Sequence, residues 1–96
     1  MRRYALLAPS SGTRIPGTLR VAVLERDGGC VGFGRFPGDC QGALELDHVR
    51  ASHAMGRKSE TAAGNLVALC GEHHRWKTAN GRVARAVLLA YLEGFR

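Results

Sequence analysis

The stretch LELDHV (residues 44–49) and, after a polar loop, NLVALCGEHHRWK (residues 65–77) decide the fold of this 96-residue chain. Apolar and polar side chains alternate in the first segment, which predicts a short strand over 43–49. The apolar run 66–69 predicts a second strand, antiparallel to the first, and the pattern turns helical from Gly71 onward. We therefore expect an α+β domain built on a β-hairpin followed by a helix.

Outside this stretch the chain divides into an N-terminal arm and one small domain. Residues 1–17 are rich in Pro, Gly and Ser and have little periodicity, so we expect a flexible arm there and a domain over 18–96. Thr18 is the expected N-cap of a helix that runs through Arg26 and ends before the glycine pair 28–29. The side chains expected on the core face of this helix are Leu19, Ala22 and Val23.

The remaining segments are an irregular knuckle and a helical C-terminus. Residues 30–42 hold four glycines, a proline and two cysteines, a composition that predicts a knuckle closed by its cysteines rather than a regular element. Gly81 weakens the helical pattern, so we expect one helix to end near Ala79 and a second one to run to Glu93. The apolar face expected on the second helix comprises Val83, Ala86, Val87, Ala90 and Tyr91, widened by Leu88, Leu89 and Leu92.

Charge and cysteine content limit the compartment and the class of partner. Lys and Arg outnumber Asp and Glu by 14 to 8, a formal charge of +6 that favours polyanions such as nucleic acid. Three cysteines are an odd number for a disulfide framework, and the N-terminal apolar run is too short for a secretory signal. No segment approaches the roughly 20 apolar residues that span a bilayer. We therefore expect a cytoplasmic protein with reduced cysteines and no membrane contact.

Three cysteines and a histidine form the first constellation that carries chemistry. Cys70 and His73, spaced Cys-x-x-His at the start of a helix, place a thiolate and an imidazole on one turn. Zinc prefers four such ligands in a tetrahedron, and Cys30 and Cys40 can supply the other two. The alternative is that the cysteines are buried, reduced and act as small hydrophobic side chains. A zinc ion would also supply the cross-link that so small a core lacks.

A second, more open constellation lies beside the first. Asp47 and His48 end the first predicted strand, and Asn65 precedes the second. His74 follows His73 and lies about 100° further round the helix, so it faces a different site. One carboxylate and one imidazole are a sparse ligand set that leaves room for water and a phosphate oxygen, and His48 could take a proton from an attacking water. The alternatives are a surface Asp-His pair and an Asn that only caps the strand.

Together these residues resemble a known family. The segments Leu46-Asp47-His48-Val49, Asn65-Leu66 and Leu69-Cys70-x-x-His73-His74-x-x-Lys77 resemble, in order and spacing, the HNH nucleases of the ββα-metal group. The resemblance covers residues 20–80 and implies that His48 is the general base that activates water. It implies that Asn65 is catalytic by fixing the loop and the orientation of His48. It also implies that Asp47 and His74 hold a catalytic Mg²⁺, Mn²⁺ or Ni²⁺.

The same resemblance implies a structural zinc and a DNA substrate. The zinc ligands would be Cys30, Cys40, Cys70 and His73, although the nine residues between the first two exceed the usual knuckle spacing. Such an endonuclease nicks one strand or cuts both, as a monomer or weak homodimer. The small free-standing nucleases it resembles are encoded beside phage packaging genes, which implies a phage packaging enzyme as a larger partner. The basic side chains expected to contact DNA are Arg50, Arg57, Lys58, Arg75 and Lys77.

Two other functions stay open from the residues alone. A zinc-stabilised nucleic-acid-binding module without catalysis keeps the cysteines and the charge and treats Asp47 and His48 as structural. A protein-interaction zinc module would use the apolar C-terminal helix to dock on a larger enzyme.

Two side chains also have open roles. We favour a solvent-exposed His53 over a ligand, and a Trp76 that packs on the core over one that stacks on a base.

Overall fold

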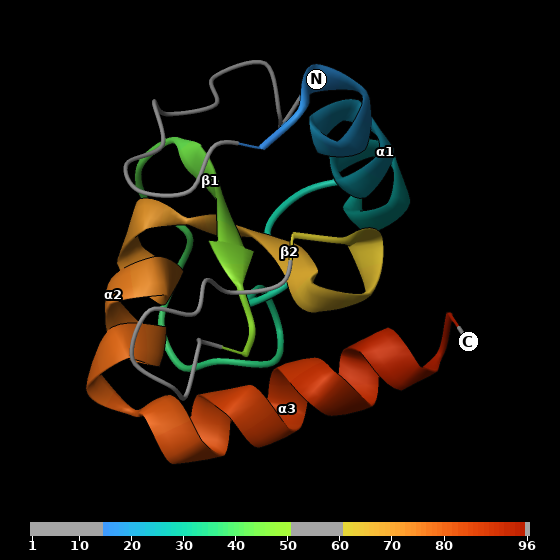
Figure 1. Cartoon of the computed structure of the whole chain (residues 1–96). Coiled ribbons are helices and arrows are strands. Elements are labelled where there is room, and N and C mark those ends of the chain that lie inside the picture. Colours follow the sequence, from blue (N-terminus) through green and yellow to red (C-terminus); the bar gives the residue numbers. More distant parts are fainter. Residues whose placement is uncertain (1–14, 51–60, 96) are drawn as a thin grey trace, which may run out of the picture.

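Two antiparallel strands lie at the centre of the fold, with helices on their flanks (Figure 1). The computed structural model describes residues 15–50 and 61–95, which form two strands and three α-helices. In chain order the elements are α1 (Gly17–Asp27), β1 (Leu44–His48), the 3-10 turn η1 (Ala63–Asn65), β2 (Leu66–Cys70), α2 (Gly71–Ala79) and α3 (Gly81–Glu93). The predicted α+β class, the antiparallel hairpin and the break between the last two helices are confirmed.

The hairpin register decides which side chains share a face. Glu45 pairs with Leu69, and Asp47 pairs with Val67. Because side chains alternate along a strand, Glu45 and Asp47 share one face while Leu46 lies on the other. Two buried clusters follow from this alternation. The first comprises Ile15, Val23, Leu24, Leu44, Leu46, Leu66, Ala68 and Cys70, and the second comprises Val31, Phe36, Val49, Val67, Leu69, Ala84, Leu88 and Leu92.

Helix α1 begins two residues earlier than predicted. Its N-cap is Pro16 rather than Thr18, and no side chain caps the helix. The fixed φ of Pro16 (−57°) leads directly into the first turn, where the carbonyl of Pro16 accepts the N–H of Arg20 at 2.9 Å. At the other end Gly28 adopts the left-handed conformation with φ 68° and stops the helix, as the sequence predicted.

The core side of α1 also differs from the prediction. Val23 and Leu24 are buried, whereas Ala22 is exposed. Ile15 lies ahead of the helix and is only 3 % exposed in the first cluster, because it closes the apolar gap between α1 and the hairpin. The expected arm over 1–17 is therefore wrong at its C-terminal end, and residues 1–14 lie outside the described residues.

In helix α3 a single line of side chains faces the core. Ala84, Leu88 and Leu92 are buried, a spacing of four residues that places them on one side of the helix. The predicted face was wrong at Val83, which is 60 % exposed, and at Ala86 and Ala90, which are also exposed, because apolar residues on several sides of this helix obscured its period. Within the described residues no helix combines the length and the apolar character needed to cross a membrane.

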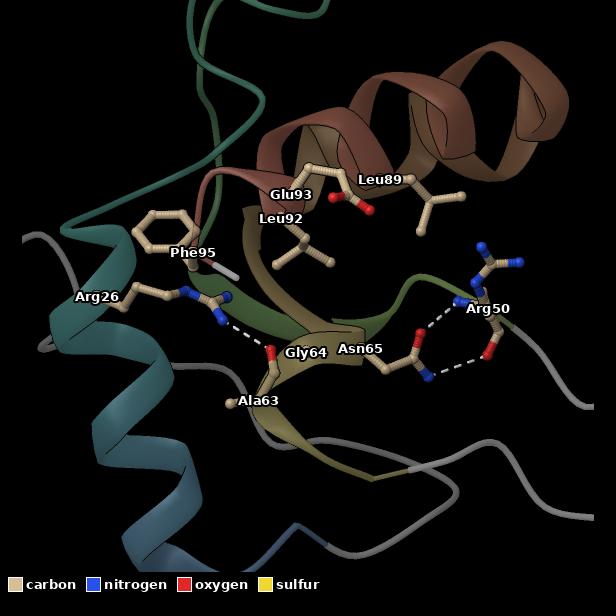
Figure 2. Close-up of a pocket in the computed structure, with 9 residues that line it drawn as sticks. All are labelled: Arg26, Arg50, Ala63, Gly64, Asn65, Leu89, Leu92, Glu93 and Phe95. Atoms are coloured by element: carbon tan, nitrogen blue, oxygen red, sulfur yellow. Dashed lines mark hydrogen bonds between the residues drawn. The ribbon is translucent and has the colours of Figure 1, made fainter.

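A buried carboxylate ties three elements together. Asp27 at the end of α1 accepts hydrogen bonds from Arg26 Nε at 2.7 Å, the Ala68 N–H of β2 at 2.9 Å and the Tyr91 hydroxyl of α3 at 2.5 Å. Burial and the neighbouring Asp27 raise the pKa of Tyr91 to about 12, so it remains a donor. Arg26 also donates to the carbonyl of Ala63 at 2.7 Å, which joins α1 to η1 (Figure 2). These hydrogen bonds tie α1 and α3 to β2, the strand that ends at Cys70.

Candidate metal centre and adjoining polar cluster

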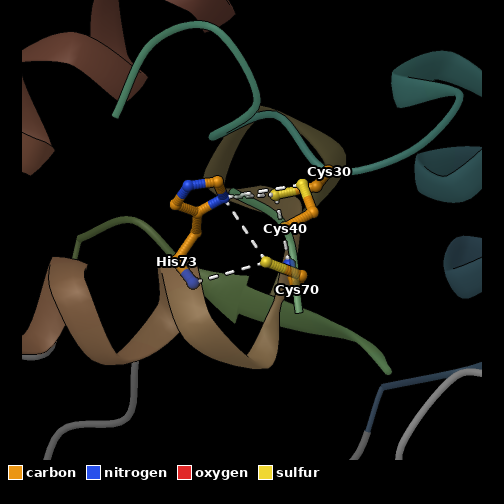
Figure 3. Close-up of side chains that lie close together, drawn as sticks. All are labelled: Cys30, Cys40, Cys70 and His73. Carbon is orange, nitrogen blue, oxygen red and sulfur yellow. Dashed lines mark hydrogen bonds between the residues drawn. The ribbon is translucent and has the colours of Figure 1, made fainter. Parts of the chain in front are cut away.

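Four potential metal ligands converge beside the hairpin (Figure 3). Cys30 and Cys40 come from the knuckle, Cys70 ends β2, and His73 lies in the first turn of α2. The Nδ1 atom of His73 lies 3.3, 3.7 and 3.4 Å from the sulfurs of Cys30, Cys40 and Cys70. Tetrahedral zinc with ordinary Zn–N and Zn–S bonds would separate nitrogen and sulfur by about 3.6 Å. The four residues are therefore close enough to hold a metal ion, which is consistent with a structural zinc.

The imidazole of His73 is oriented for this role by its other nitrogen. Nε2 lies 3.2 Å from the carbonyl oxygen of Pro37 and 3.0 Å from that of Gly38, so it carries the proton and leaves the Nδ1 lone pair to the sulfurs. The ring is fully buried. Gly32 packs directly on it, since a Cβ there would lie 2.8 Å from His73 Cγ. The knuckle thus both orients the ring and encloses it.

The three thiols do not ionise equally. Burial raises the pKa of Cys30, and burial together with the neighbouring thiols raises that of Cys40 to about 12. Burial also acts to raise the pKa of Cys70, but hydrogen bonds including the N–H of His73 at 3.4 Å bring it below its ordinary value. Three thiolates this close repel one another, and a bound dication would supply the opposing charge.

A second polar cluster joins β1 to α2. Its members are Glu45, Asp47, His74 and Lys77. His74 Nδ1 contacts a carboxylate oxygen of Glu45, and Nε2 lies 3.3 Å from Asp47 Oδ1. Lys77 Nζ lies 2.7 Å from the second oxygen of Asp47. Hydrogen bonds to Asp47 first and Glu45 second raise the pKa of His74 to about 9. Burial acts against ionisation of Asp47, yet its contacts with His74 and Lys77 hold its pKa below the ordinary value.

The two remaining predicted site residues lie at the ends of neighbouring elements. His48 is the last residue of β1, and Asn65 is the last residue of η1, directly before β2. His48 Nε2 is 3.1 Å from Thr61 Oγ1, and its carbonyl accepts a hydrogen bond from Lys77 Nζ at 3.1 Å. By strand alternation the His48 ring leaves β1 on the face opposite to Asp47. The side chain of Asn65 brackets Arg50: Oδ1 accepts the N–H at 2.8 Å and Nδ2 donates to the carbonyl at 3.2 Å (Figure 2). Asn65 therefore fixes the backbone just after His48.

The basic residues expected to contact DNA have different surroundings. Arg50 is exposed and lines a pocket of about 420 Å³. Arg75 is exposed and pairs with Glu72 at 2.6 Å. The ammonium of Lys77, which was also expected to face phosphates, lies between Asp47 and the His48 carbonyl. The other expected positions, Arg57 and Lys58, lie outside the described residues, as does His53.

Two members of the polar region were missed by sequence reasoning. Glu45 precedes Asp47 by two residues on a strand, so alternation alone could have placed both carboxylates on one face. Thr61 follows the loop and carries no signal that could have linked it to His48. Trp76 packs as expected: it is half-buried, with its ring centroid 4.6 Å from that of Phe36.

The described residues thus bring two clusters together around consecutive histidines. The cysteines and His73 form a closed set of four, whereas Asp47 and His74 form an open pair, and the His48 ring leaves β1 on the opposite face of the strand. The closed set lies close enough to hold one metal ion within the fold. Comparisons of the chain with protein-family models, with curated proteins and with solved structures find no match.

Proposed function

We propose that the protein is a metal-dependent DNA endonuclease of the HNH type, with a ββα-metal site formed by β1, β2 and α2. The observation that carries this proposal is the pair Asp47 and His74, whose facing atoms are 3.3 Å apart. Two ligands about 2.1 Å from one octahedral ion lie about 3.0 Å apart when they are at right angles. The pair therefore suits one shared Mg²⁺, Mn²⁺ or Ni²⁺ with most coordination positions open.

In this proposal His48 is the general base. In the tautomer that donates Nε2–H to Thr61, the basic atom is Nδ1, which would take the proton of the attacking water. A divalent ion bound at the neighbouring pair would stabilise the charge that builds on the phosphate and on the leaving 3′ oxygen. Thr61 keeps the ring in one orientation while the proton moves.

The surrounding residues have supporting roles. Asn65 holds both backbone groups of Arg50 and so fixes the turn that follows His48. Lys77 bridges Asp47 and the His48 carbonyl, which links the ion ligand to the base through one side chain. It also neutralises one oxygen of Asp47 and leaves the other directed toward His74.

DNA binding in this proposal is electrostatic. The formal charge of +6 and the exposed side chains of Arg50 and Arg75 support phosphate contacts without base reading. A single active site would nick one strand, and cleavage of both strands would need two copies or a partner. A phage packaging enzyme as that partner, and the cytoplasm as the place of action, belong to the same proposal.

Nicking of supercoiled plasmid tests the proposal. The purified protein would be incubated with Mg²⁺, Mn²⁺ or Ni²⁺, beside an EDTA control and the variant His48→Ala. We expect metal-dependent relaxation that falls by about 10²- to 10⁴-fold in the variant, the usual contribution of a general base. Unchanged turnover in His48→Ala, with zinc content and melting intact, would contradict the role of His48.

A second candidate is a zinc-stabilised nucleic-acid-binding module without catalysis. One observation favours it: Lys77 already pairs with Asp47, so the carboxylate has a partner without any ion. This candidate predicts a salt-dependent gel shift with DNA and no cleavage with any of the three ions. The plasmid assay therefore separates the two functions.

A further inference from the structure

Both ring nitrogens of His74 face carboxylates that come from the same strand. Nδ1 contacts Glu45 and Nε2 faces Asp47 at 3.3 Å. Because residues two apart on a strand point to one side, β1 presents both carboxylates together to α2. One imidazole of α2 thus spans two carboxylates of β1.

An ion shared with His74 can lie at only one of these two nitrogens, since their lone pairs diverge in the ring plane. The separation between Nε2 and Asp47 suits two ligands of one ion. Glu45 is instead in direct hydrogen-bond contact with Nδ1, which leaves no space for an ion between them. An ion would therefore bind at Nε2, between His74 and Asp47, and the ring proton would lie on Nδ1, in the hydrogen bond to Glu45.

We propose that Glu45 is a positioning residue that holds His74 with its proton on Nδ1 and the Nε2 lone pair directed toward the ion shared with Asp47. This inference rests on the proposed function, because the ion is the one proposed for cleavage. The carboxylate acts as an outer partner of a ligand histidine, which orients the ring and increases its basicity. The neighbouring His73 has the opposite arrangement. Its Nε2–H donates to the carbonyl oxygens of Pro37 and Gly38, and its Nδ1 lone pair faces the sulfurs.

Ion binding to the zinc-loaded full-length protein tests this role. Mn²⁺ affinity would be measured from the electron paramagnetic resonance signal of the free ion, for the parent, Glu45→Ala, Glu45→Gln and the control Glu72→Ala. We expect Glu45→Ala to weaken Mn²⁺ binding by about 10- to 100-fold, and Glu45→Gln, which keeps an acceptor oxygen, by less than about 10-fold. Glu72 pairs with Arg75 on the same helix, so its loss should leave the affinity unchanged.

A second readout reports the tautomer directly. Long-range ¹H–¹⁵N spectra of the Mg²⁺-loaded protein should show the His74 proton on Nδ1 in the parent and in Glu45→Gln, and lose this preference in Glu45→Ala. The Glu45 side chain is 31 % exposed, so both variants are expected to keep their melting temperature and zinc content.

Three results would overturn the inference. Parent-like affinity and tautomer in Glu45→Ala would remove the positioning role while the proposed endonuclease stands. Equal loss in Glu45→Gln and Glu45→Ala would make Glu45 a direct ligand instead. A parent protein that binds no Mn²⁺ would remove the ion site, and the proposed function with it.

Discussion

His73 and His74 are neighbours in sequence, yet they belong to two clusters with different physical character. His73 is fully buried among three sulfurs and two carbonyl oxygens. The side chain of His74 is 34 % exposed and lies between two carboxylates. Closed, complete ligand sets serve structure, and open ones serve chemistry. One helical turn thus directs two consecutive histidines into different clusters, because about 100° of rotation separates them.

The largest expected effect breaks the closed cluster. Cys70→Ala removes one of the four residues that lie close enough to hold a metal ion and the acceptor that caps α2, so we expect loss of zinc and of cooperative folding. Thermal melting with zinc analysis measures both, and zinc removal from the parent by a chelator should reproduce the variant. A variant with the parent's melting temperature and metal content would show that the cysteines act only as small apolar side chains.

Breaking the open cluster should have a different outcome. In the proposed function His74 is a direct ligand of the catalytic ion, so His74→Ala is expected to reduce cleavage by more than the roughly 10- to 100-fold that follows loss of an outer group. Its partly exposed ion pairs contribute about 1 kcal/mol or less to folding, so melting and zinc content should stay near those of the parent. Loss of zinc in this variant would contradict the division between the two histidines.

A smaller effect is expected from Asn65, whose side chain holds the backbone just after His48. Asn65→Ala leaves the backbone groups of Arg50 without their side-chain partners, which should cost about 1–3 kcal/mol in the free energy of unfolding. Cleavage should fall as well, while zinc content stays unchanged. Denaturant unfolding provides the measurement, and Asn65→Asp, which keeps the acceptor for the Arg50 N–H, should recover part of the stability. Equal losses in both variants would contradict this account.

The smallest effect concerns DNA affinity alone. Arg50→Gln removes one exposed cation. The slope of the logarithm of the DNA-binding constant against the logarithm of the salt concentration should therefore decrease in magnitude by about one. Filter binding at several salt concentrations gives this slope. Zinc content and melting should not change, since the side chain is exposed. An unaltered slope would place the phosphate contacts elsewhere on the molecule.

Local patterns were sufficient for the hairpin, for the break between α2 and α3, and for the four ligands of the closed cluster. Alternation along β1 and the Cys-x-x-His spacing at a helix start are properties of short segments, so they can be read without the fold. The side of α3 that faces the core could not be read in this way. Its apolar residues surround much of the helix, and only packing selects the line that contains Ala84 and Leu88.

The open cluster was predictable only in part for a related reason. Residue type and order are enough to single out Asp47 and His74, and the structure places them face to face. The positions of Glu45 and Lys77 depend on which face of β1 meets α2, and that is a tertiary property. The sequence pattern alone therefore predicts a phosphate contact for Lys77, whereas its ammonium pairs with Asp47 within the cluster.

The close approach of Gly32 to His73 limits which residues evolution can place at this position. A β-carbon at this position would lie 2.8 Å from His73 Cγ and 2.9 Å from Phe36 Cδ2, so a lineage that keeps this ring in place cannot vary there freely. We expect relatives to inherit Cys-x-Gly together with Cys-x-x-His as one signature. A homologue with the four ligands and a larger residue at this position would mark a branch in which the knuckle has been rebuilt.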